Sequence, residues 1–253
     1  MLKQENITIG IIGYGVIGIA FKKWIEKNTK CKVAISDPPK NINDDLSNCN
    51  VFFIGIHIPT ENDGTQDLTV LENIITGLPS APIFIRTTLI PGTTDALCKK
   101  FSKKIYFMPE FLTERTAYED FQSQAVIVTG EEELLNEIFK DKKRFYMNNM
   151  EAEISKYTHN VFGAVKVTYF NSIYKLCKDK GIDYNKVLEG TLISGYISPN
   201  HTNVPGPDGC FGYGGKCFPK DIAAFASFNI DNELNSFLNK IIEMNYFFRN
   251  NKK

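Results

Sequence analysis

The sequence predicts an α/β protein: a doubly wound parallel sheet in its first part, followed by a region made of helices. Short apolar runs alternate with helical patterns up to about residue 128, which is typical of βαβ units. From about Glu151 this alternation stops and the apolar residues follow a helical period. A chain of 253 residues is long enough for two cores. We therefore expect an α/β domain over residues 1–148 and a helical domain over residues 149–253.

The overall composition argues against several classes of partner. Lysine plus arginine equals aspartate plus glutamate, at 29 each, so no general charge favours nucleic acid or an anionic membrane. No apolar run is long enough to span a bilayer, and no apolar leader precedes the first strand. The six cysteines lack metal-type Cys-x-x-Cys spacing. We expect a cytoplasmic protein with reduced thiols, no bound metal and a small-molecule partner.

Six apolar runs have the length and the β-branched or aromatic content of buried strands. These runs are Ile7–Ile12, Cys31–Ser36, Asn50–Ile56, Ala81–Arg86, Ile105–Met108 and Ala125–Val128. Ligands of such sheets lie beyond the carboxyl ends of the strands. Thr88 follows the fourth run, and Glu110 and Glu114 follow the fifth. Each residue alone is more typical of a turn or a helix cap, but their common edge makes them candidate site residues.

The first strand leads into a dinucleotide-binding fingerprint. Gly13-Tyr-Gly-Val-Ile-Gly18 lies between that strand and a helical pattern, as the G-x-G-x-x-G motif requires. Gly13 would make the tight turn, Gly15 would let the backbone approach a pyrophosphate, and Gly18 would allow close helix packing. Asp37 ends the second strand, near the position of the acid that holds ribose hydroxyls. The pattern predicts a Rossmann-type domain that prefers NAD to NADP; a purely structural glycine turn is the alternative.

The second part reads as helices joined by one long loop. A helix is expected over Glu151–Lys180, with Lys156 and Asn160 four residues apart on one face. Lys156 could instead extend along the apolar stripe to water. A shorter helix is expected over Asp183–Ile193, followed by a loop rich in proline and glycine over Gly195–Gly215. His201 in this loop could contact a substrate or simply hold the loop by hydrogen bonds.

Cys217 lies in the glycine-rich stretch Gly212–Asp221, where its reactivity can be tuned. Pro219 is suited to the first position of a helix that continues through Asp221–Ser227. A cysteine near a helix N-terminus is favoured as the nucleophilic thiolate, and Lys216 and Lys220 act in the same direction. The alternative is that one of six cysteines happens to lie in a glycine-rich turn.

Several separated segments together resemble one family, the UDP-glucose/GDP-mannose dehydrogenases. The matching segments, in order, are Gly13–Gly18, Thr87–Thr88, Pro109–Glu114, Glu153–Asn160 and Phe211–Asp221. The resemblance implies a four-electron oxidation of a nucleotide-sugar primary alcohol, UDP-glucose-like, to the uronic acid. Two NAD would be reduced per turnover, in the service of polysaccharide synthesis. It also implies a homodimer, with the Glu151–Lys180 helix as its spine.

The resemblance carries roles onto individual residues. Cys217 matches the nucleophile that captures the aldehyde as a thiohemiacetal and then forms a thioester. Lys156 and Asn160 match the pair that stabilises the oxyanion. Glu110 matches a proposed acid/base residue, and Thr88 and Asp221 match residues that hold the water for thioester cleavage. The implied cofactor-binding residues are Gly13, Tyr14, Gly15, Val16, Ile17, Gly18, Asp37, Thr88 and Glu114. The implied substrate-binding residues are Glu110, Phe111, Leu112, Lys156, Asn160, Gly214 and Lys220.

Two features depart from the family pattern. The chain ends soon after Glu243-Met-Asn245, about where family members continue into a third, nucleotide-binding domain. In addition, Tyr196-Ile-Ser198 occupies the place of an Arg-Ile-Gly that often reaches the partner subunit's substrate. Two other functions therefore stay open: a two-electron dehydrogenase of a β-hydroxyacid or sugar phosphate, which would not need Cys217, and a catalytically degenerate NAD-binding scaffold.

Overall fold

The computed structural model describes residues 3–61, 63–130, 133–228 and 232–250. The chain forms two compact units. The first comprises Met1–Pro59 and Gln66–Lys156, and the second comprises Thr60–Thr65 and Tyr157–Lys253. A short segment from the middle of the first half therefore belongs to the second unit. The domain boundary that we expect at residues 148 and 149 stays a prediction.

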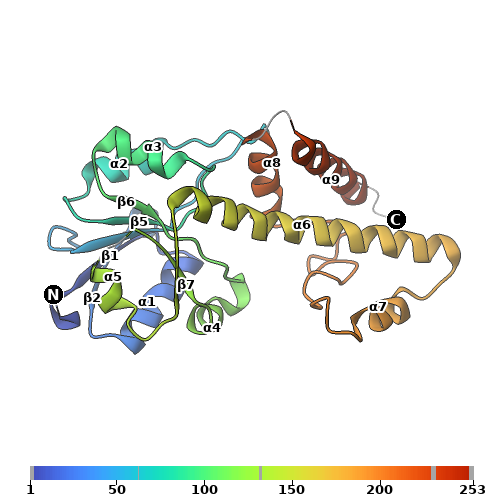
Figure 1. Cartoon of the computed structure of the whole chain (residues 1–253), viewed down its shortest axis with the longest axis horizontal. Coiled ribbons are helices and arrows are strands. Elements are labelled where there is room, and N and C mark those ends of the chain that lie inside the picture. Colours follow the sequence, from blue (N-terminus) through green and yellow to red (C-terminus); the bar gives the residue numbers. More distant parts are fainter. Residues whose placement is uncertain (1–2, 62, 131–132, 229–231, 251–253) are drawn as a thin grey trace. The chain divides into compact units, whose positions relative to one another are not determined.

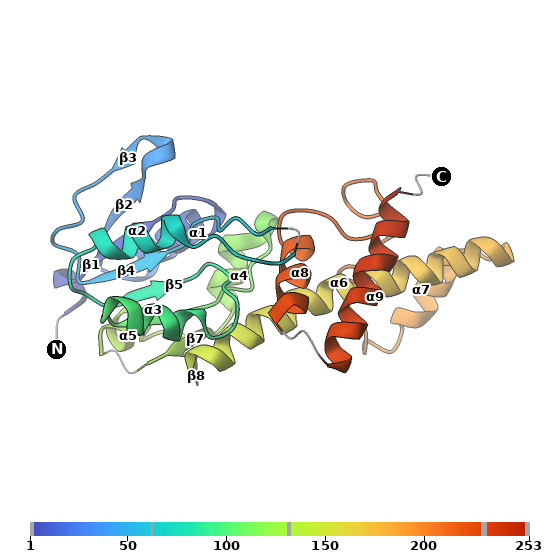
Figure 2. The same ribbon diagram turned by 90° about the horizontal axis from the view of Figure 1, so that it is seen from above.

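The first unit is built on a six-stranded sheet with the order β3-β2-β1-β4-β5-β6. All neighbouring strands are parallel except β3, which pairs antiparallel with β2 at the edge (Figure 2). The strands are β1 (Thr8–Ile12), β2 (Lys32–Asp37), β3 (Ile42–Asn43), β4 (Val51–Ile54), β5 (Ile83–Ile85) and β6 (Ile105–Phe107). The sheet confirms the predicted parallel α/β fold and the first five strands, and it adds the short β3.

Helices cover both faces of this sheet, as the double winding requires (Figure 1). One core contains Phe52, Ile54 and Ile85 of the strands and the apolar sides of α2 and α3. The opposite core contains Phe53 and Phe84 with α1, α4 and α5. These helices are α1 (Val16–Asn28), α2 (Thr69–Gly77), α3 (Thr93–Phe101), α4 (Ala117–Ser123) and α5 (Glu133–Ile138). Because both faces are covered, the strands are apolar throughout rather than alternating.

The sixth predicted strand forms but joins a different sheet. β7 (Val126–Thr129) pairs parallel with β8 (Arg144–Met147) in a separate two-stranded sheet. The strand β8 was not predicted, because Arg144 and the exposed Phe145 and Tyr146 do not form a buried apolar run. Short 3-10 helices complete the unit: η1 (Gln4–Asn6), η2 (Pro38–Lys40) and η3 (Glu114–Thr116).

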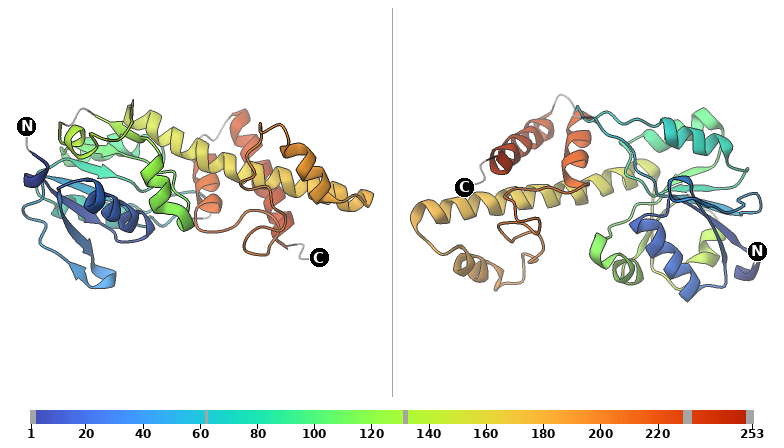
Figure 3. Two further views of the ribbon diagram at one scale, coloured as in Figure 1. Left: turned by 90° about the horizontal axis from the view of Figure 1, so that it is seen from below. Right: turned by 180° about the vertical axis from the view of Figure 1, so that it is seen from behind.

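The second unit is helical. The long α6 (Asn149–Lys180) runs from the first unit into the second, and α7 (Tyr184–Leu192) lies beside its C-terminal half (Figure 3). Phe170 and Cys177 of α6 pack there against Tyr184 of α7. The remaining helices are α8 (Phe218–Phe228) and α9 (Glu233–Asn250). Residues 193–217 form no helix or strand, as expected for the long loop.

Two further contacts fix local structure. Glu153 on α6 is fully buried and accepts hydrogen bonds from the amides of Gly92 and Thr94, at 2.6 and 2.9 Å, and from the Thr94 hydroxyl at 2.6 Å. Its carboxylate thus caps the N-terminus of α3. In the second unit, Gly64 packs against α8 so closely that a Cβ would lie 2.6 Å from the Ala223 carbonyl oxygen.

Across the described ranges, none of the helices has the length and apolarity needed to cross a membrane.

Candidate active site

The glycine turn after β1 has the geometry that a dinucleotide phosphate needs. Gly13 has a φ of +89°, and a Cβ there would lie 2.3 Å from the Gly55 carbonyl oxygen. A Cβ on Gly18 would lie 2.3 Å from the Gly13 carbonyl oxygen, so both positions exclude any larger residue. By contrast, a Cβ on Gly15 would meet nothing within 4 Å. Gly15 is also the N-cap of α1 and makes no side-chain cap, which leaves open space before the helix amides for an anion.

Asp37 ends β2 and is tied to this turn. Its Oδ2 accepts a hydrogen bond from the Tyr14 amide at 2.8 Å, and Lys40 Nζ lies 3.7 Å from the same oxygen. The carboxylate therefore orders the glycine turn, and it also sits at the strand end where a ribose would be held. Val16 and Ile17, also predicted here, begin α1. The neighbouring Lys40 places a cation beside the Asp37 carboxylate.

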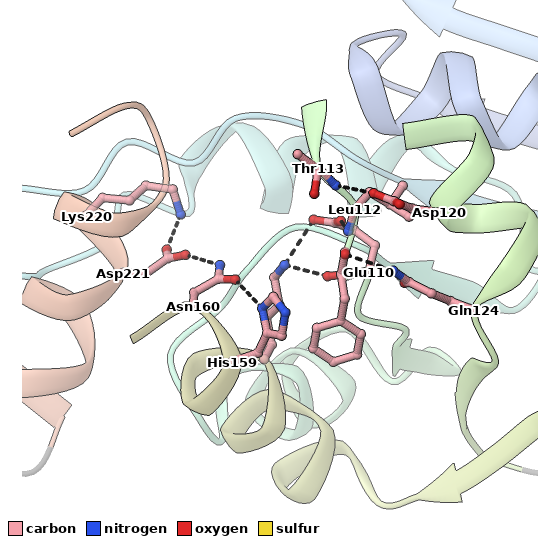
Figure 4. A network of polar contacts seen from close by, with 11 residues as sticks. Glu110, Leu112, Thr113, Asp120, Gln124, His159, Asn160, Lys220 and Asp221 are labelled. Carbon is pink, nitrogen blue, oxygen red and sulfur yellow. Dashed lines mark hydrogen bonds and ion pairs between the residues drawn. The ribbon is translucent and has the colours of Figure 1, made fainter. Parts of the chain in front are cut away.

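In the first unit, Lys156 forms a buried ion pair with Glu110, which is labelled in Figure 4. Lys156 Nζ lies 3.1 Å from Glu110 Oε1 and also donates to the Glu110 carbonyl oxygen. Only 5% of the Lys156 side chain and 11% of the Glu110 side chain are exposed. The Leu112 amide donates to Glu110 Oε2 at 2.6 Å, and the ammonium lies 5.4 Å from the centre of the Phe111 ring. Lys156 is therefore fixed inside the protein and does not extend to water.

In the second unit, Asn160 and Asp221 form a buried polar pair (Figure 4). Asn160 Nδ2 donates to Asp221 Oδ2 at 2.6 Å, and Lys220 forms an ion pair with Asp221 Oδ1. Asp221 is 1% exposed and Asn160 is 6% exposed. His159 Nδ1 contacts Asn160 Oδ1 at 3.0 Å, so both ends of the Asn160 amide are held. These two contacts fix which way the Asn160 amide points.

Cys217 directly precedes α8 and is exposed. Its carbonyl oxygen accepts the Asp221 amide at 2.9 Å, which makes Cys217 the N-cap of this helix. Pro219 is the second residue of α8, not the first as predicted, because the helix begins at Phe218. The thiol nevertheless lies at a helix N-terminus, where the helix dipole favours the thiolate.

The remaining predicted residues occupy varied surroundings. Thr88 is buried three residues after β5 ends, and its carbonyl oxygen accepts a hydrogen bond from Gln66. Glu114 is exposed as the first residue of η3. A Cβ on Gly214 would lie 2.2 Å from the Arg249 guanidinium. His201 has a φ of +65°, and its ring meets the Phe218 ring edge-on at 5.2 Å.

Three further residues near the candidate site were not predicted. Asn171 and Asn245 bind the backbone just before Cys217. Arg86 at the end of β5 is 2% exposed, lies about 5.0 Å from the Phe21 ring, and burial lowers its pKa to about 10. An asparagine within the apolar pattern of a long helix, such as Asn171, was the one available signal in the sequence.

A pocket of about 220 Å³ lies elsewhere in the second unit, between α6, α9 and the loop. Its lining residues are Asn171, Tyr174, Lys175, Lys178, Asp179, Phe211, Phe247 and Phe248. None of the residues predicted to form the site lines it. Among the described residues, no cluster of three or more histidine, cysteine, aspartate or glutamate side chains could hold a metal ion.

These features define a class of protein: an α/β dinucleotide-binding unit joined to a helical unit that presents a cysteine at a helix N-terminus. Residues 22–148 match the model of the UDP-glucose/GDP-mannose dehydrogenase family NAD binding domain, and residues 150–246 match that of its central domain. The chain belongs to the UDP-glucose/GDP-mannose dehydrogenase family. NAD is therefore its cofactor, and the open glycine turn and Asp37 fit it.

The curated relatives that the chain matches agree with this assignment. UDP-glucose 6-dehydrogenase of Pseudomonas aeruginosa is 30% identical over 205 residues, covering 71% of this chain and 44% of that protein. UDP-glucose 6-dehydrogenase of Rickettsia bellii is 30% identical over 231 residues, covering 83% of this chain and 51% of that protein. The chain thus spans about half the length of the curated relatives it matches.

Solved structures share the fold. A UDP-glucose dehydrogenase from Pyrobaculum islandicum superposes with a TM-score of 0.76 at 21% identity, covering 98% of this chain and 70% of that chain. A UDP-D-ManNAc dehydrogenase from Pyrococcus horikoshii superposes with a TM-score of 0.74 at 19% identity, covering 96% of this chain and 69% of that chain. At this level of identity, the likeness concerns the fold alone.

Proposed function

We propose that the chain oxidises the primary alcohol of a nucleotide sugar, UDP-glucose-like, to the uronic acid in two NAD-dependent steps. The alcohol first loses a hydride and a proton to give an aldehyde. The Cys217 sulfur then adds to the aldehyde carbon to give a thiohemiacetal, which loses a second hydride and a proton to become a thioester. Water cleaves the thioester, releasing the acid and regenerating the thiol. Two NAD molecules, bound one after the other, would each accept one of these hydrides.

The observation that carries this proposal is the surroundings of Cys217. The cysteine is exposed at the N-terminus of α8, one helical turn before the buried Asp221, and Asp221 is bonded to Asn160 of α6. A two-electron alcohol oxidation needs no such nucleophile. An exposed thiol with a helix dipole behind it suits the capture of an aldehyde.

Lys156 and Asn160 are suited to stabilise the oxygen that becomes negative at each step. They lie one turn apart on α6, and both side chains are buried and held by hydrogen bonds. A cation and an amide donor that are already desolvated need little reorganisation when charge develops, which is why such groups are effective.

Glu110 and Asp221 are the carboxylates proposed for proton transfer. Glu110 keeps an ionic partner in Lys156, so a proton leaving the substrate alcohol could pass to a group whose charge is balanced. Asp221 is proposed to hold the water that attacks the thioester. For Thr88, in the first unit, the proposed role is the one that the resemblance implies. The roles of Phe111, Leu112, Gly214 and Lys220 in binding the sugar, and of Glu114 at the cofactor, belong to the same proposal.

The test is to count NADH formed per sugar consumed, with purified protein, NAD and a panel of UDP- and GDP-sugars. The proposal expects two NADH per sugar and an acid product. Cys217→Ser should abolish acid formation, whereas the matched variant Cys210→Ser, in the same loop, should retain it. One NADH per sugar, or full acid production by Cys217→Ser, would contradict the thioester route.

We also propose that the chain forms a homodimer through α6. Phe162, Tyr169 and Leu176 are spaced by seven residues and are 65, 57 and 53% exposed, so they form an apolar stripe along one side of the helix. Light scattering should report a dimer that Tyr169→Glu weakens. The matched exposed variant Tyr196→Glu, in the long loop, should leave the mass unchanged. A monomeric wild-type chain would contradict this proposal.

A further inference from the structure

We propose that α9 is part of the catalytic machinery: Asn245 and Arg249, together with Asn171 of α6, are positioning residues that hold the loop carrying Cys217. The proposal rests on the function proposed above for Cys217. All of the contacts that carry it lie within the second unit.

Asn245 binds both polar groups of one loop residue. Its Oδ1 accepts the Tyr213 amide at 2.7 Å, and its Nδ2 donates to the Tyr213 carbonyl oxygen at 3.1 Å. A side-chain amide that pairs with a backbone N–H and C=O in this way makes the same two hydrogen bonds as a residue of a neighbouring β-strand. It therefore fixes the loop in one orientation. This contact is four residues before Cys217.

Asn171 anchors the preceding residue from the other side. Its Oδ1 accepts the Gly212 amide at 2.9 Å, while its Nδ2 donates to the Val167 carbonyl oxygen within α6 at 2.8 Å. Asn171 is 2% exposed, so loss of this partner would leave a buried polar group unsatisfied. Two consecutive amides of the loop thus donate to asparagines on two different helices.

Arg249, near the end of α9, is the third residue that contacts the loop. Its Nη1 donates to Asp208 Oδ2 at 2.7 Å, and Asp208 lies within the turn that the Gly209 amide and the Gly206 carbonyl oxygen close. A Cβ on Gly214 would lie 2.2 Å from Nη2 of the same guanidinium, so Arg249 lies directly against the loop backbone. A Cβ on Gly212 would likewise lie 2.4 Å from Asn245 Oδ1. The loop has no side chains at these positions, and α9 occupies the space.

The loop needs these outside anchors because of its own composition. Gly212 and Gly215 have φ values of +71° and +78°, which glycine adopts readily but which it also leaves readily. Ordering such residues costs backbone conformational entropy. Side chains from α6 and α9 offset that cost, and the position of Cys217 at the N-cap of α8 depends on their contacts.

The experiment compares Asn245→Ala with Asn245→Asp, which retains the acceptor for the Tyr213 amide. Asn250→Ala is the matched control, because Asn250 is an exposed asparagine on the same helix. Hydrogen–deuterium exchange over residues 211–217 reports loop order. The alkylation rate of the Cys217 peptide with iodoacetamide, read by mass spectrometry, reports thiol reactivity without any substrate. Steady-state kinetics with NAD and the active sugar nucleotide supply kcat and KM.

We expect Asn245→Ala to exchange amides 212 and 213 at least about tenfold faster, a change of 1.4 kcal/mol in opening free energy. Alkylation should slow at least about threefold, because the thiol loses its fixed place at the helix N-terminus. The kcat should fall while the KM for NAD and the unfolding midpoint stay near those of Asn250→Ala. Asn245→Asp should recover part of each loss, which a general defect in folding would not do.

Other outcomes would overturn the proposal. Unchanged exchange in Asn245→Ala would show that the asparagine does not order the loop. Faster exchange with unchanged alkylation would show that loop order does not govern Cys217. If the wild-type chain oxidises no sugar nucleotide, the function proposed above fails, but exchange and alkylation still decide whether α9 positions the cysteine.

Discussion

The buried carboxylate of Asp221 gives a quantitative test of the site in the second unit. It accepts a hydrogen bond from Asn160 Nδ2 at 2.6 Å and pairs with Lys220, and it is 1% exposed. It also lies in the first turn of α8, where a negative charge is favoured by the helix dipole. Asp221→Ala removes all three interactions at once.

The magnitude follows from the burial of the two partners. Removing one member of a buried ion pair costs about 3–5 kcal/mol, because the other charge is stranded. The Lys220 side chain is 22% exposed, so its ammonium can reach water and the cost should fall near the lower end of that range. The Asn160 amide cannot reach water and loses its acceptor, which costs about 1–3 kcal/mol. We expect a net loss of about 3–5 kcal/mol, since such terms overlap.

The assay is urea unfolding of the wild-type protein and variants, followed by far-ultraviolet circular dichroism. The matched control is Asp179→Ala, which breaks the pair of Lys175 and Asp179 in the same unit, at 2.9 Å with side chains 51 and 57% exposed. An exposed pair of this kind contributes about 0.2–1 kcal/mol. If the two variants lost equal stability, the argument that burial makes the Asp221 contacts strong would be refuted.

Three further predictions concern the first unit. Asp37→Ala should narrow the preference for NAD over NADP, measured by titration of both cofactors; an unchanged preference would remove Asp37 from the cofactor site. Gly13→Ala should abolish NAD binding and lower the melting temperature, because its Cβ would lie 2.3 Å from a backbone oxygen at a φ of +89°. Burial raises the pKa of Glu153 in the folded protein above its value in the unfolded chain. The stability that Glu153 contributes is therefore fully present below the pKa of the unfolded chain, and it is lost as the pH rises through the pKa of the folded protein. Relative to wild type, Glu153→Gln should therefore cost less stability at pH 7 than at about pH 4.5, as urea unfolding would report; a constant difference would contradict a raised pKa.

Much of the first unit could be predicted because its signals are local. A strand buried on both faces is a continuous apolar run, as in Val51–Ile54, and the glycine turn needs residues of fixed type at fixed spacing. The edge strand β3 contributes only Ile42 and Asn43, which is too short to show a period. The pairing of β7 with β8 depends on long-range register, which apolar content does not encode.

For the candidate site, the sequence supplies the proposed members but not the contacts that they make. Cys217 could be placed at a helix start because Pro219 and Asp221 follow it. The pair of Lys156 and Glu110 joins residues 46 apart in sequence, and nothing near Lys156 distinguishes a buried lysine from one that reaches water. Asn245 gave no signal either, because an asparagine on an amphipathic helix is ordinarily a surface residue.

The Thr60–Thr65 segment has a practical consequence for anyone who wishes to express the helical unit by itself. A gene fragment that starts near residue 149 would carry α8 but would omit the turn at Gly64 that covers Ala223 and Ser227. The apolar and carbonyl surface beneath it would then meet solvent, on the helix that Cys217 begins. Two designs would restore the missing turn: a circular permutant that carries residues 60–65 in the same chain, or a split version that supplies them in trans. In either form α8 should keep its native surroundings.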